Sequence, residues 1–174
     1  MRSPGQRAGL SRAAVLAAAR ELIAADGAGA LSMRALARRL DVAPNALYSH
    51  VADKTDLLDQ LLDDLLAGVE TGGIETMMTS TYRALTAHPE LVPLFLQRQG
   101  ARGPNAIRLG EILDDLLAKA GVDDVPEARR VLIVHAIGFA AFAAADETQR
   151  TDAGFTRSLG WLLAGMTKAP TRNG

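Results

Sequence analysis

The chain lacks cysteine altogether and is poor in aromatic residues. With no cysteine among 174 residues, disulfides, iron–sulfur clusters and zinc–thiolate sites are excluded, and nothing points to an oxidising compartment. Aromatic residues make up only 4% of the chain. Runs of alternating β-branched residues are almost missing, whereas alanine and leucine are abundant. Because Ala and Leu favour helices while β-branched and aromatic residues favour strands, the composition predicts an all-α protein.

Targeting and membrane-spanning segments are not evident either. The opening residues, MRSPGQRAGL, are basic but lack the apolar core of a signal peptide. The most apolar stretch, residues 131–145, contains His135 and is shorter than a membrane-spanning helix needs to be. We therefore expect a cytoplasmic protein with no membrane partner.

Catalytic motifs are also missing. There is no glycine-rich phosphate loop and no nucleophile elbow. His50, His88 and His135 lie far apart in the sequence, without further ligands at helical spacing. We expect no enzymatic activity, no metal and no cofactor, and we read His135 as a core histidine or a hydrogen-bonding group in a pocket.

Charge is unevenly distributed along the chain. Residues 1–54 contain eight Lys and Arg side chains against four acidic ones, a net charge of +4. The remaining residues contain eleven basic and sixteen acidic side chains, a net charge of −5. A basic first third on an acidic remainder suits contact with a polyanion through one end of the molecule, although a basic segment can also be only a solvated face.

Residues 31–62 have the pattern of a helix-turn-helix followed by a longer helix. Ser32 is a good N-cap for a first short helix, and Asp41 is one of the few residue types that tolerates the left-handed conformation of a tight turn. Pro44 suits the first position of a second helix, which we expect to end near His50. Asp53 is expected to cap the long helix that follows. This spacing predicts a helix-turn-helix.

The run LSMRALARRLDVAPNALYSHVADKTDLL resembles the DNA-binding domain of the tetracycline-repressor (TetR) family of bacterial transcription regulators. The most specific part is LYSHV, followed by Asp53-Lys54 and Leu57-Leu58. One departure is Asp41, where the family more often has glycine. The resemblance covers roughly residues 10–66 and implies a flexible basic arm (1–9), a helix-turn-helix domain (10–66) and a ligand-binding and dimerisation domain (67–174).

The resemblance also implies which residues contact DNA. The second short helix would enter the major groove, Arg34 would read a base, and a second group would hold phosphates. Asn45 is open to two interpretations, adenine recognition or helix solubility, and the arm is either a plain tail or a DNA contact. The expected DNA-binding set is Ser32, Arg34, Pro44, Asn45, Ala46, Tyr48, Ser49, His50 and Lys54.

Beyond residue 70 the sequence contains helical patterns but no motif. Besides a first helix over 11–26 and the long helix over 54–69, we expect helices at 74–87, 90–99, 105–120, 126–145 and 153–166. The last two are rich in small residues beside bulky ones, which suits close helix packing. They form either a core within one chain or the four-helix interface of a homodimer, which we favour. The expected dimerisation residues are Gly138, Ala141, Ala145, Gly160, Trp161 and Ala164.

The same implied domain should hold a mostly apolar pocket for a small hydrophobic effector, whose identity the sequence does not reveal. Its expected lining is Met77, Met78, Tyr82, His88, Phe95, Leu113, Leu117, His135, Phe139 and Phe142. The leading hypothesis is therefore a repressor that leaves double-stranded operator DNA when its effector binds. The alternatives are a helix-turn-helix dimer without a small-molecule effector and, from another class, a small helical enzyme with a DNA-binding-like domain.

Overall fold

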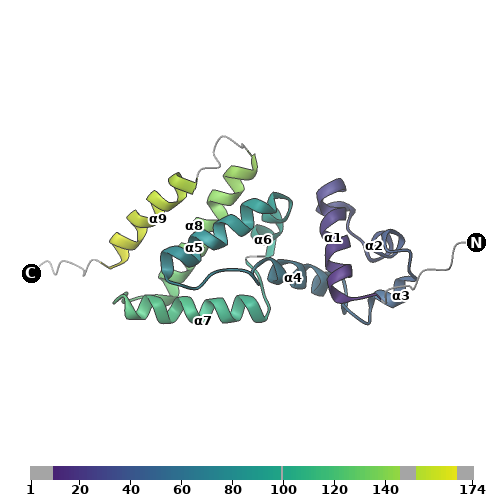
Figure 1. Ribbon diagram of the computed structural model, residues 1–174, viewed down its shortest axis with the longest axis horizontal. Helices are drawn as coiled ribbons and strands as arrows, with labels where there is room; N and C mark the ends of the chain where they lie inside the picture. The colour runs from purple at the N-terminus through teal and green to yellow at the C-terminus, as the bar shows by residue number, and fades with distance from the viewer. Residues whose placement is uncertain (1–9, 99, 146–151, 168–174) are drawn as a thin grey trace, which may run out of the picture. The chain divides into compact units, whose positions relative to one another are not determined.

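The computed structural model describes residues 10–98, 100–145 and 152–167, and within them it forms nine α-helices and two short 3-10 helices, with no strand. The expected arm at residues 1–9 lies outside the described residues. The all-α prediction is confirmed. The chain divides into two compact units, and we call residues 10–61 the head and residues 62–167 the body (Figure 1).

The head consists of α1 (Arg12–Asp26), a 3-10 turn (Ala28–Ala30), α2 (Met33–Arg39), α3 (Pro44–Leu47) and the first part of α4 (Lys54–Leu65). The Ser11 hydroxyl caps α1 by accepting a hydrogen bond from the Ala14 amide at 3.2 Å. Gly27, at φ 80°, ends the helix. The core is made of fully buried aliphatic side chains from α1 to α4, among them Val15, Leu16, Ala19, Ile23, Leu31, Leu36, Leu47, Leu57 and Leu61.

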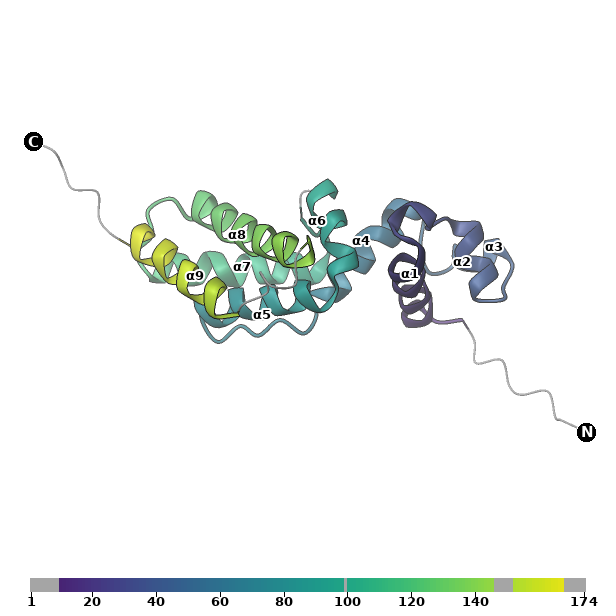
Figure 2. The same ribbon diagram turned by 90° about the horizontal axis from the view of Figure 1, so that it is seen from above.

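The body contains the end of α4, α5 (Ile74–Ala87), a 3-10 turn (Pro89–Leu91), α6 (Val92–Arg98), α7 (Pro104–Lys119), α8 (Val125–Ala145) and α9 (Asp152–Met166). Helix α8 packs against α5, α6, α7 and α9, so it is the central helix of this unit. Figure 2 shows α8 and α9 running beside α5 and α7 in one bundle. Its core is apolar, with Tyr82, Leu85, Leu117, Leu132, Ala136, Phe155 and Leu159 completely buried.

The long helix after the helix-turn-helix is shorter than expected from the sequence. Helix α4 ends at Leu65 and not near Val69, because the amides of Leu66, Ala67 and Val69 bond to carbonyls three residues back, which tightens the chain into turns before Gly68. The apolar stretch at residues 131–145, which alone is shorter than a membrane-spanning helix, is part of α8, a helix of 21 residues. By length and composition alone α8 would be able to cross a membrane, which by itself is weak evidence, and a third of its most apolar window is buried in the body.

Candidate nucleic-acid interface and effector cavity

The turn between α2 and α3 has a defined geometry. Asp41 is the one described residue other than glycine with positive φ, at 51°, which confirms its predicted left-handed conformation. The Asp41 amide donates to the Arg38 carbonyl at 3.3 Å, and the Val42 amide donates to the Ala37 carbonyl at 3.0 Å. These two bonds are a Schellman motif, which satisfies the last carbonyls of α2 and turns the chain sharply into α3.

Helix α3 is shorter than expected and ends at Leu47, not at His50. Pro44 occupies its first turn as predicted, and Leu47 is fully buried, so one side of the helix is fixed in the head core. The following residues continue as turns, and the Ser49 hydroxyl donates to the Ala46 carbonyl at 2.8 Å, competing with the backbone bonding of a longer helix.

The exposed side of α3 carries most of the residues predicted to face DNA. Pro44, Asn45 and Ser49 are exposed, Tyr48 is 53% exposed, and Ala46 and His50 are half-buried. A 53% exposed tyrosine beside a buried leucine is unusual for a residue with a large apolar ring, because such rings are normally covered. The contact roles of these residues stay predictions.

The start of α4 is held by a hydrogen-bonded cap. Asp53 accepts a bond from the Asp56 amide at 2.8 Å, and the Asp56 carboxylate accepts from the Ala52 amide at 2.7 Å. Gln60 adds a bond from its side-chain amide to the His50 carbonyl at 3.3 Å. This reciprocal capping ties the segment after α3 to α4 and fixes the position of exposed Lys54 in the first turn.

Basic side chains of the head divide into two groups. Arg39 forms an ion pair with Glu21 at 2.8 Å, and the Arg12 guanidinium donates to the Gln60 side chain at 2.6 Å. Within the described part of the chain, Arg34 and Lys54 are exposed and form no ion pair. Ser32 uses its hydroxyl to cap α2 through the Ala35 amide at 3.1 Å. Two unpaired cations therefore stand at helix starts, Arg34 in the first turn of α2 and Lys54 in the first turn of α4.

The body contains a cavity of about 170 Å³. For comparison, an engineered apolar cavity of about 150 Å³ accommodates benzene. Among the described residues that line it, none is charged and Thr81 is the one with a hydroxyl group. The Thr81 hydroxyl donates to the Met77 carbonyl at 2.8 Å, which leaves its oxygen able to accept a further bond. The lining is Leu66, Met77, Met78, Thr81, Leu85, Phe95, Gly100, Ala101, Ala106, Leu109, Gly110, Leu113, Ile133 and Ile137.

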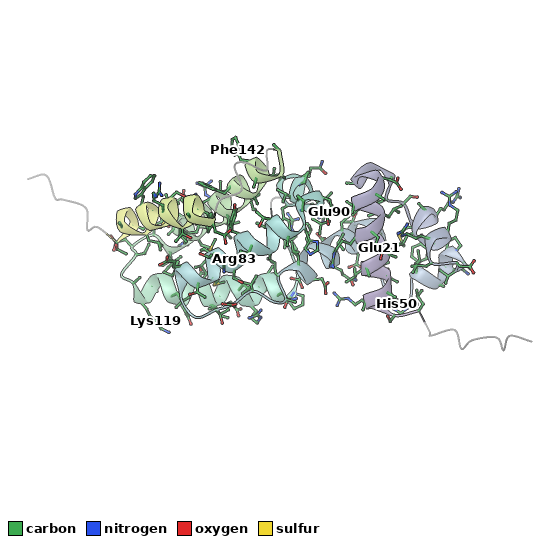
Figure 3. All side chains as sticks on the ribbon, turned by 45° about the horizontal axis from the view of Figure 1, so that its top comes forward. Glu21, His50, Arg83, Glu90, Lys119 and Phe142 are labelled. Carbon is green, nitrogen blue, oxygen red and sulfur yellow. The ribbon has the colours of Figure 1, made fainter. Side chains whose placement is uncertain are left out.

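Four of the ten residues predicted to line a pocket lie at this cavity, namely Met77, Met78, Phe95 and Leu113. Tyr82 and Leu117 are fully buried elsewhere in the core. His88 is half-buried and lies 3.3 Å from Glu90. Phe142 is 73% exposed, and Figure 3 shows it on the outside of the bundle, so the structure places it away from the cavity. A sequence with apolar residues on several faces of a helix does not reveal which face meets a cavity and which meets solvent.

His135 and Phe139 belong to an aromatic cluster and do not line the cavity. The His135 ring lies 4.5 Å from the Phe139 ring and 5.0 Å from the Phe155 ring, and Phe155 stacks on Tyr82 at 4.3 Å. The His135 Nε2 is 3.2 Å from the Ser158 hydroxyl. Burial lowers the pKa of His135, partly offset by a backbone hydrogen bond involving Phe155. The geometry fits a core histidine with a hydroxyl partner.

The residues predicted for dimerisation lie on the side of α8 and α9 that the chain itself leaves open. A Cβ atom added at Gly138 or Gly160 would meet no atom within 4 Å. Trp161 is 70% exposed, Ala145 and Ala164 are exposed, and Ala141 is half-buried. By contrast Ala136, Ala140 and Ala143 are buried. The small residues of α8 therefore serve two faces, one packed within the chain and one uncovered.

Several residues at the cavity were not singled out by the sequence. Leu109, Ile133 and Ile137 have ordinary helical spacing, and Gly100 and Ala101 are in a loop, so no pattern distinguishes them from core residues. Asp63 was also missed, although a carboxylate that is 2% exposed is rare and needs partners. Its signal in the sequence is weak, because Asp59 and Asp64 have the same appearance.

Comparisons with known proteins cover the head in one case and most of the chain in others. Residues 15–61 match the family model described as "Bacterial regulatory proteins, tetR family". An HTH-type transcriptional regulator from Saccharopolyspora erythraea is 38% identical over 121 residues, which are 64% of this chain and 51% of that protein. The chain therefore spans about half the length of this curated relative.

Two solved structures resemble nearly the whole chain. BioQ with its double-stranded DNA operator superposes with a TM-score of 0.72 at 29% identity, covering 92% of this chain and 99% of that one. A variant of TetR from Acinetobacter baumannii in complex with minocycline superposes with a TM-score of 0.75 at 26% identity, covering 92% and 99%. The similarity thus extends from the head through the body.

Proposed function

We propose, from the match of residues 15–61 to the tetR family of bacterial regulatory proteins, that this chain belongs to that family and is a sequence-specific DNA-binding transcription regulator of the cytoplasm. We further propose that it is a repressor released from its operator by a small hydrophobic effector. The observation that carries the proposal is the helix-turn-helix at residues 33–47, which lies inside the segment that matches the family.

The DNA contacts follow from exposure and charge in the head. Helix α3 enters the major groove, with Asn45, Tyr48 and Ser49 directed at the DNA. Arg34 reads a guanine through O6 and N7, because a guanidinium can donate two parallel hydrogen bonds to these acceptors. Lys54 holds a phosphate at the start of α4. The tie between α4 and the segment after α3 supports this role, since it fixes Lys54 relative to α3.

A symmetric operator needs two heads, and the uncovered face of α8 and α9 is the proposed dimer interface. Trp161 and Phe142 are at least 70% exposed, although aromatic side chains usually gain most from burial. The open space at Gly138 and Gly160 lets the helices of a second copy approach closely. Two such helices from each copy would form a four-helix interface.

The cavity in the body is the proposed effector site. Its lining contains no charged residue, so burying an ionic ligand there would cost solvation energy without a compensating partner. A neutral, largely apolar effector fits, with Thr81 available for one hydrogen bond. Occupation of the cavity would displace Leu66 and the adjoining end of α4, and α4 continues into the head. A coupling of about 1–3 kcal/mol would weaken operator binding roughly 5–150-fold.

The alternative function is a DNA-binding dimer without a small-molecule effector. A cavity alone does not separate the two, because natural cores contain small voids. A thermal-shift screen of neutral aromatic compounds, paired with carboxylated analogues of the same ring size, tests the difference. The proposal expects the neutral compounds to raise Tm by mass action and the charged analogues to have no effect.

The decisive step is to titrate a neutral compound that raises Tm into the complex with a duplex selected by the protein from a random-sequence pool. Weakened duplex binding at saturating compound supports effector release. Unchanged affinity at saturation contradicts it and favours the alternative. Failure to select any consensus from the pool contradicts sequence-specific DNA binding itself.

A further inference from the structure

The carboxylate of Asp63 is buried at the end of α4 and has several hydrogen-bond donors. It accepts from the Ala106 amide at 2.8 Å, from the Asn105 amide at 3.3 Å and from the Asn105 side-chain amide at 3.0 Å. The Asn105 side chain also donates to the Asp63 carbonyl at 3.2 Å. With only 2% of the residue exposed, the carboxylate exchanges its hydration for these donors. We call this set the Asp63 clasp.

The clasp replaces an ordinary helix cap. Gly103 is the N-cap residue of α7 and has no side chain, so it provides no cap of its own. Pro104 follows without an amide hydrogen, and the next two amides, those of Asn105 and Ala106, are the ones that Asp63 accepts from. An N-cap carboxylate normally bonds these same positions from within the helix. Here it is supplied by a different helix, α4.

Gly103 is required for this arrangement. A Cβ atom at residue 103 would lie 2.5 Å from the Asp63 Cγ and 2.8 Å from its Oδ1. The absence of a side chain therefore allows the end of α4 to reach the start of α7. The φ of Gly103, 160°, is extended backbone, so close approach rather than conformational freedom accounts for the glycine.

The clasp and the cavity share a wall. Gly100, Ala101 and Ala106 line the cavity, and the Ala106 amide is the shortest donor to Asp63. On the other side, Leu66 lines the cavity three residues after Asp63. A molecule that enlarges the cavity therefore displaces the start of α7, to which the end of α4 is hydrogen-bonded through Asp63.

We infer that the Asp63 clasp is the link through which occupation of the cavity moves α4, with Asp63 and Asn105 acting as positioning residues. The inference rests on the proposed function, because it assumes that the cavity controls DNA binding. Apolar packing alone would let the start of α7 slide over the end of α4, since hydrophobic contacts have little directionality. Hydrogen bonds with fixed geometry make the two helix ends move together.

The test replaces the unidentified effector by a side chain. Thr81→Phe adds an aromatic ring to the cavity from α5, which makes no part of the clasp. Thr76→Phe is its matched control, because Thr76 is exposed on the same helix. Each is combined with Asp63→Asn, which keeps the side-chain size but replaces one acceptor oxygen with a donor. Affinity is measured for a duplex that the unmodified protein selects from a random-sequence pool.

The expected result is that Thr81→Phe weakens duplex binding roughly 5–150-fold when the clasp is intact, the range of an ordinary allosteric coupling. In the Asp63→Asn background, the fold-loss of duplex affinity caused by Thr81→Phe should be under about a third of its value in the Asp63 protein. The two substitutions are then not additive, and a double-mutant cycle measures their interaction. Thr76→Phe should change affinity less than about twofold in either background.

The possible contrary results differ in what they overturn. If Thr81→Phe weakens duplex binding equally in both backgrounds, the Asp63 clasp does not transmit the coupling, but effector release remains supported. No weakening in either background, with the chain folded by circular dichroism, overturns the coupling of cavity to DNA and the clasp with it.

Asn105→Ala serves as a second clasp variant if Asp63→Asn does not fold, because it removes the two bonds from the Asn105 side chain but keeps both backbone donors. It should reduce the effect of Thr81→Phe in the same direction, and a full effect in this background contradicts the clasp. Asp115→Asn, an exposed change on the same helix α7, is the matched control and should leave the effect unchanged.

Discussion

The head and the body both bury cores of aliphatic residues, but they expose different kinds of side chain. In the head the exposed residues of the helix-turn-helix include Tyr48 but are largely polar or charged, such as Arg34, Asn45 and Lys54. In the body the exposed side of α8 and α9 carries Phe142 and Trp161. A polar surface is stable in water without a partner, whereas a large exposed apolar patch is usually covered by one.

Because of this difference, the geometry of the head can be explained from its own residues, whereas the function of the open face of the body cannot. The head is organised by short-range caps and turns, so its geometry follows from residues close together in sequence. The body has one face buried in its own bundle and another left open, and the function of the open face depends on a second molecule.

The open face of the body should be sensitive to added bulk without loss of the fold. Gly138→Leu and Gly160→Leu place a side chain where, among the described residues, nothing lies within 4 Å of an added Cβ atom, so the monomer should fold normally. In a dimer the same side chains would separate the two copies, and operator affinity should fall on the order of 100-fold or more with the loss of two-headed binding. Sedimentation gives the assembly state and a binding titration gives the affinity.

Ala140→Leu is the contrasting variant on the same helix. Ala140 is 1% exposed, so overpacking there should lower the free energy of unfolding by about 1–3 kcal/mol. If Gly138→Leu destabilises the fold as much as Ala140→Leu does, or leaves a dimer intact, the face of α8 that contains Gly138 is not the interface.

Arg34 and Lys54, the unpaired cations at the two helix starts, should have separable roles. Arg34→Ala should reduce the free energy of binding to the preferred sequence by about 1–3 kcal/mol. It should also relax the base preference at one base pair. Lys54→Ala should weaken all sequences alike and reduce the slope of log affinity against log salt by about one. Titrations of a selected and a scrambled duplex at several salt concentrations measure both effects. An unaltered base preference in Arg34→Ala removes the base-reading role, and an unaltered salt slope in Lys54→Ala removes the phosphate contact.

The turn of the head should respond to a strictly local change. Asp41 has φ 51°, a region that β-branched residues avoid, so Asp41→Val should lower the free energy of unfolding by about 1–2 kcal/mol. Asp41→Gly should change it by less than about 1 kcal/mol, because relief of strain is offset by greater freedom of the unfolded chain. Urea denaturation measures both variants. Equal stability of the valine and glycine variants would mean that the turn tolerates another conformation.

The smallest expected effect is a pH dependence of the body. Burial lowers the pKa of His135 in the folded state below the usual histidine value of about 6.5. The unfolded chain therefore binds the proton more readily, and stability present above pH 6.5 is lost as the pH falls toward the folded-state pKa. The loss should be below about 1 kcal/mol, since the ring is only half-buried. His135→Gln should flatten the decline in Tm between pH 7.5 and 5.5, and an equally steep decline would assign it to other groups.

The sequence allowed much of the head to be predicted and less of the body. Ser32, Asp53 and Pro44 act at helix starts as predicted, because capping depends on neighbours within three residues. The end of α3 was predicted three residues too late, since the Ser49 hydroxyl bonds the backbone there. Boundaries set by side-chain competition of this kind are hard to derive from periodicity.

The helix positions of the body could be predicted from the sequence, but not which side of each helix faces the core, the cavity or solvent. Helices α5 and α9 agree closely with the residue ranges expected from apolar spacing and breakers. Phe142 and Phe139 look equivalent in the sequence, yet one is exposed and the other lies in an aromatic cluster. Which residues meet at the cavity depends on how α5, α7 and α8 rotate about their axes, and Asp63 and Gly103 are paired only by the fold.

The exposure of Trp161 gives the molecule a built-in optical probe. It is the one tryptophan in the chain, and at 70% exposure its indole is in water when nothing covers α9. Intrinsic emission excited at the red edge of tyrosine absorption therefore comes from α9 alone, and the head contributes nothing to it. Association through this face would shift the emission to shorter wavelength as the indole leaves water, whereas events confined to the head would leave the spectrum unchanged. Dilution series of the unlabelled protein can thus separate assembly from DNA binding in a single cuvette.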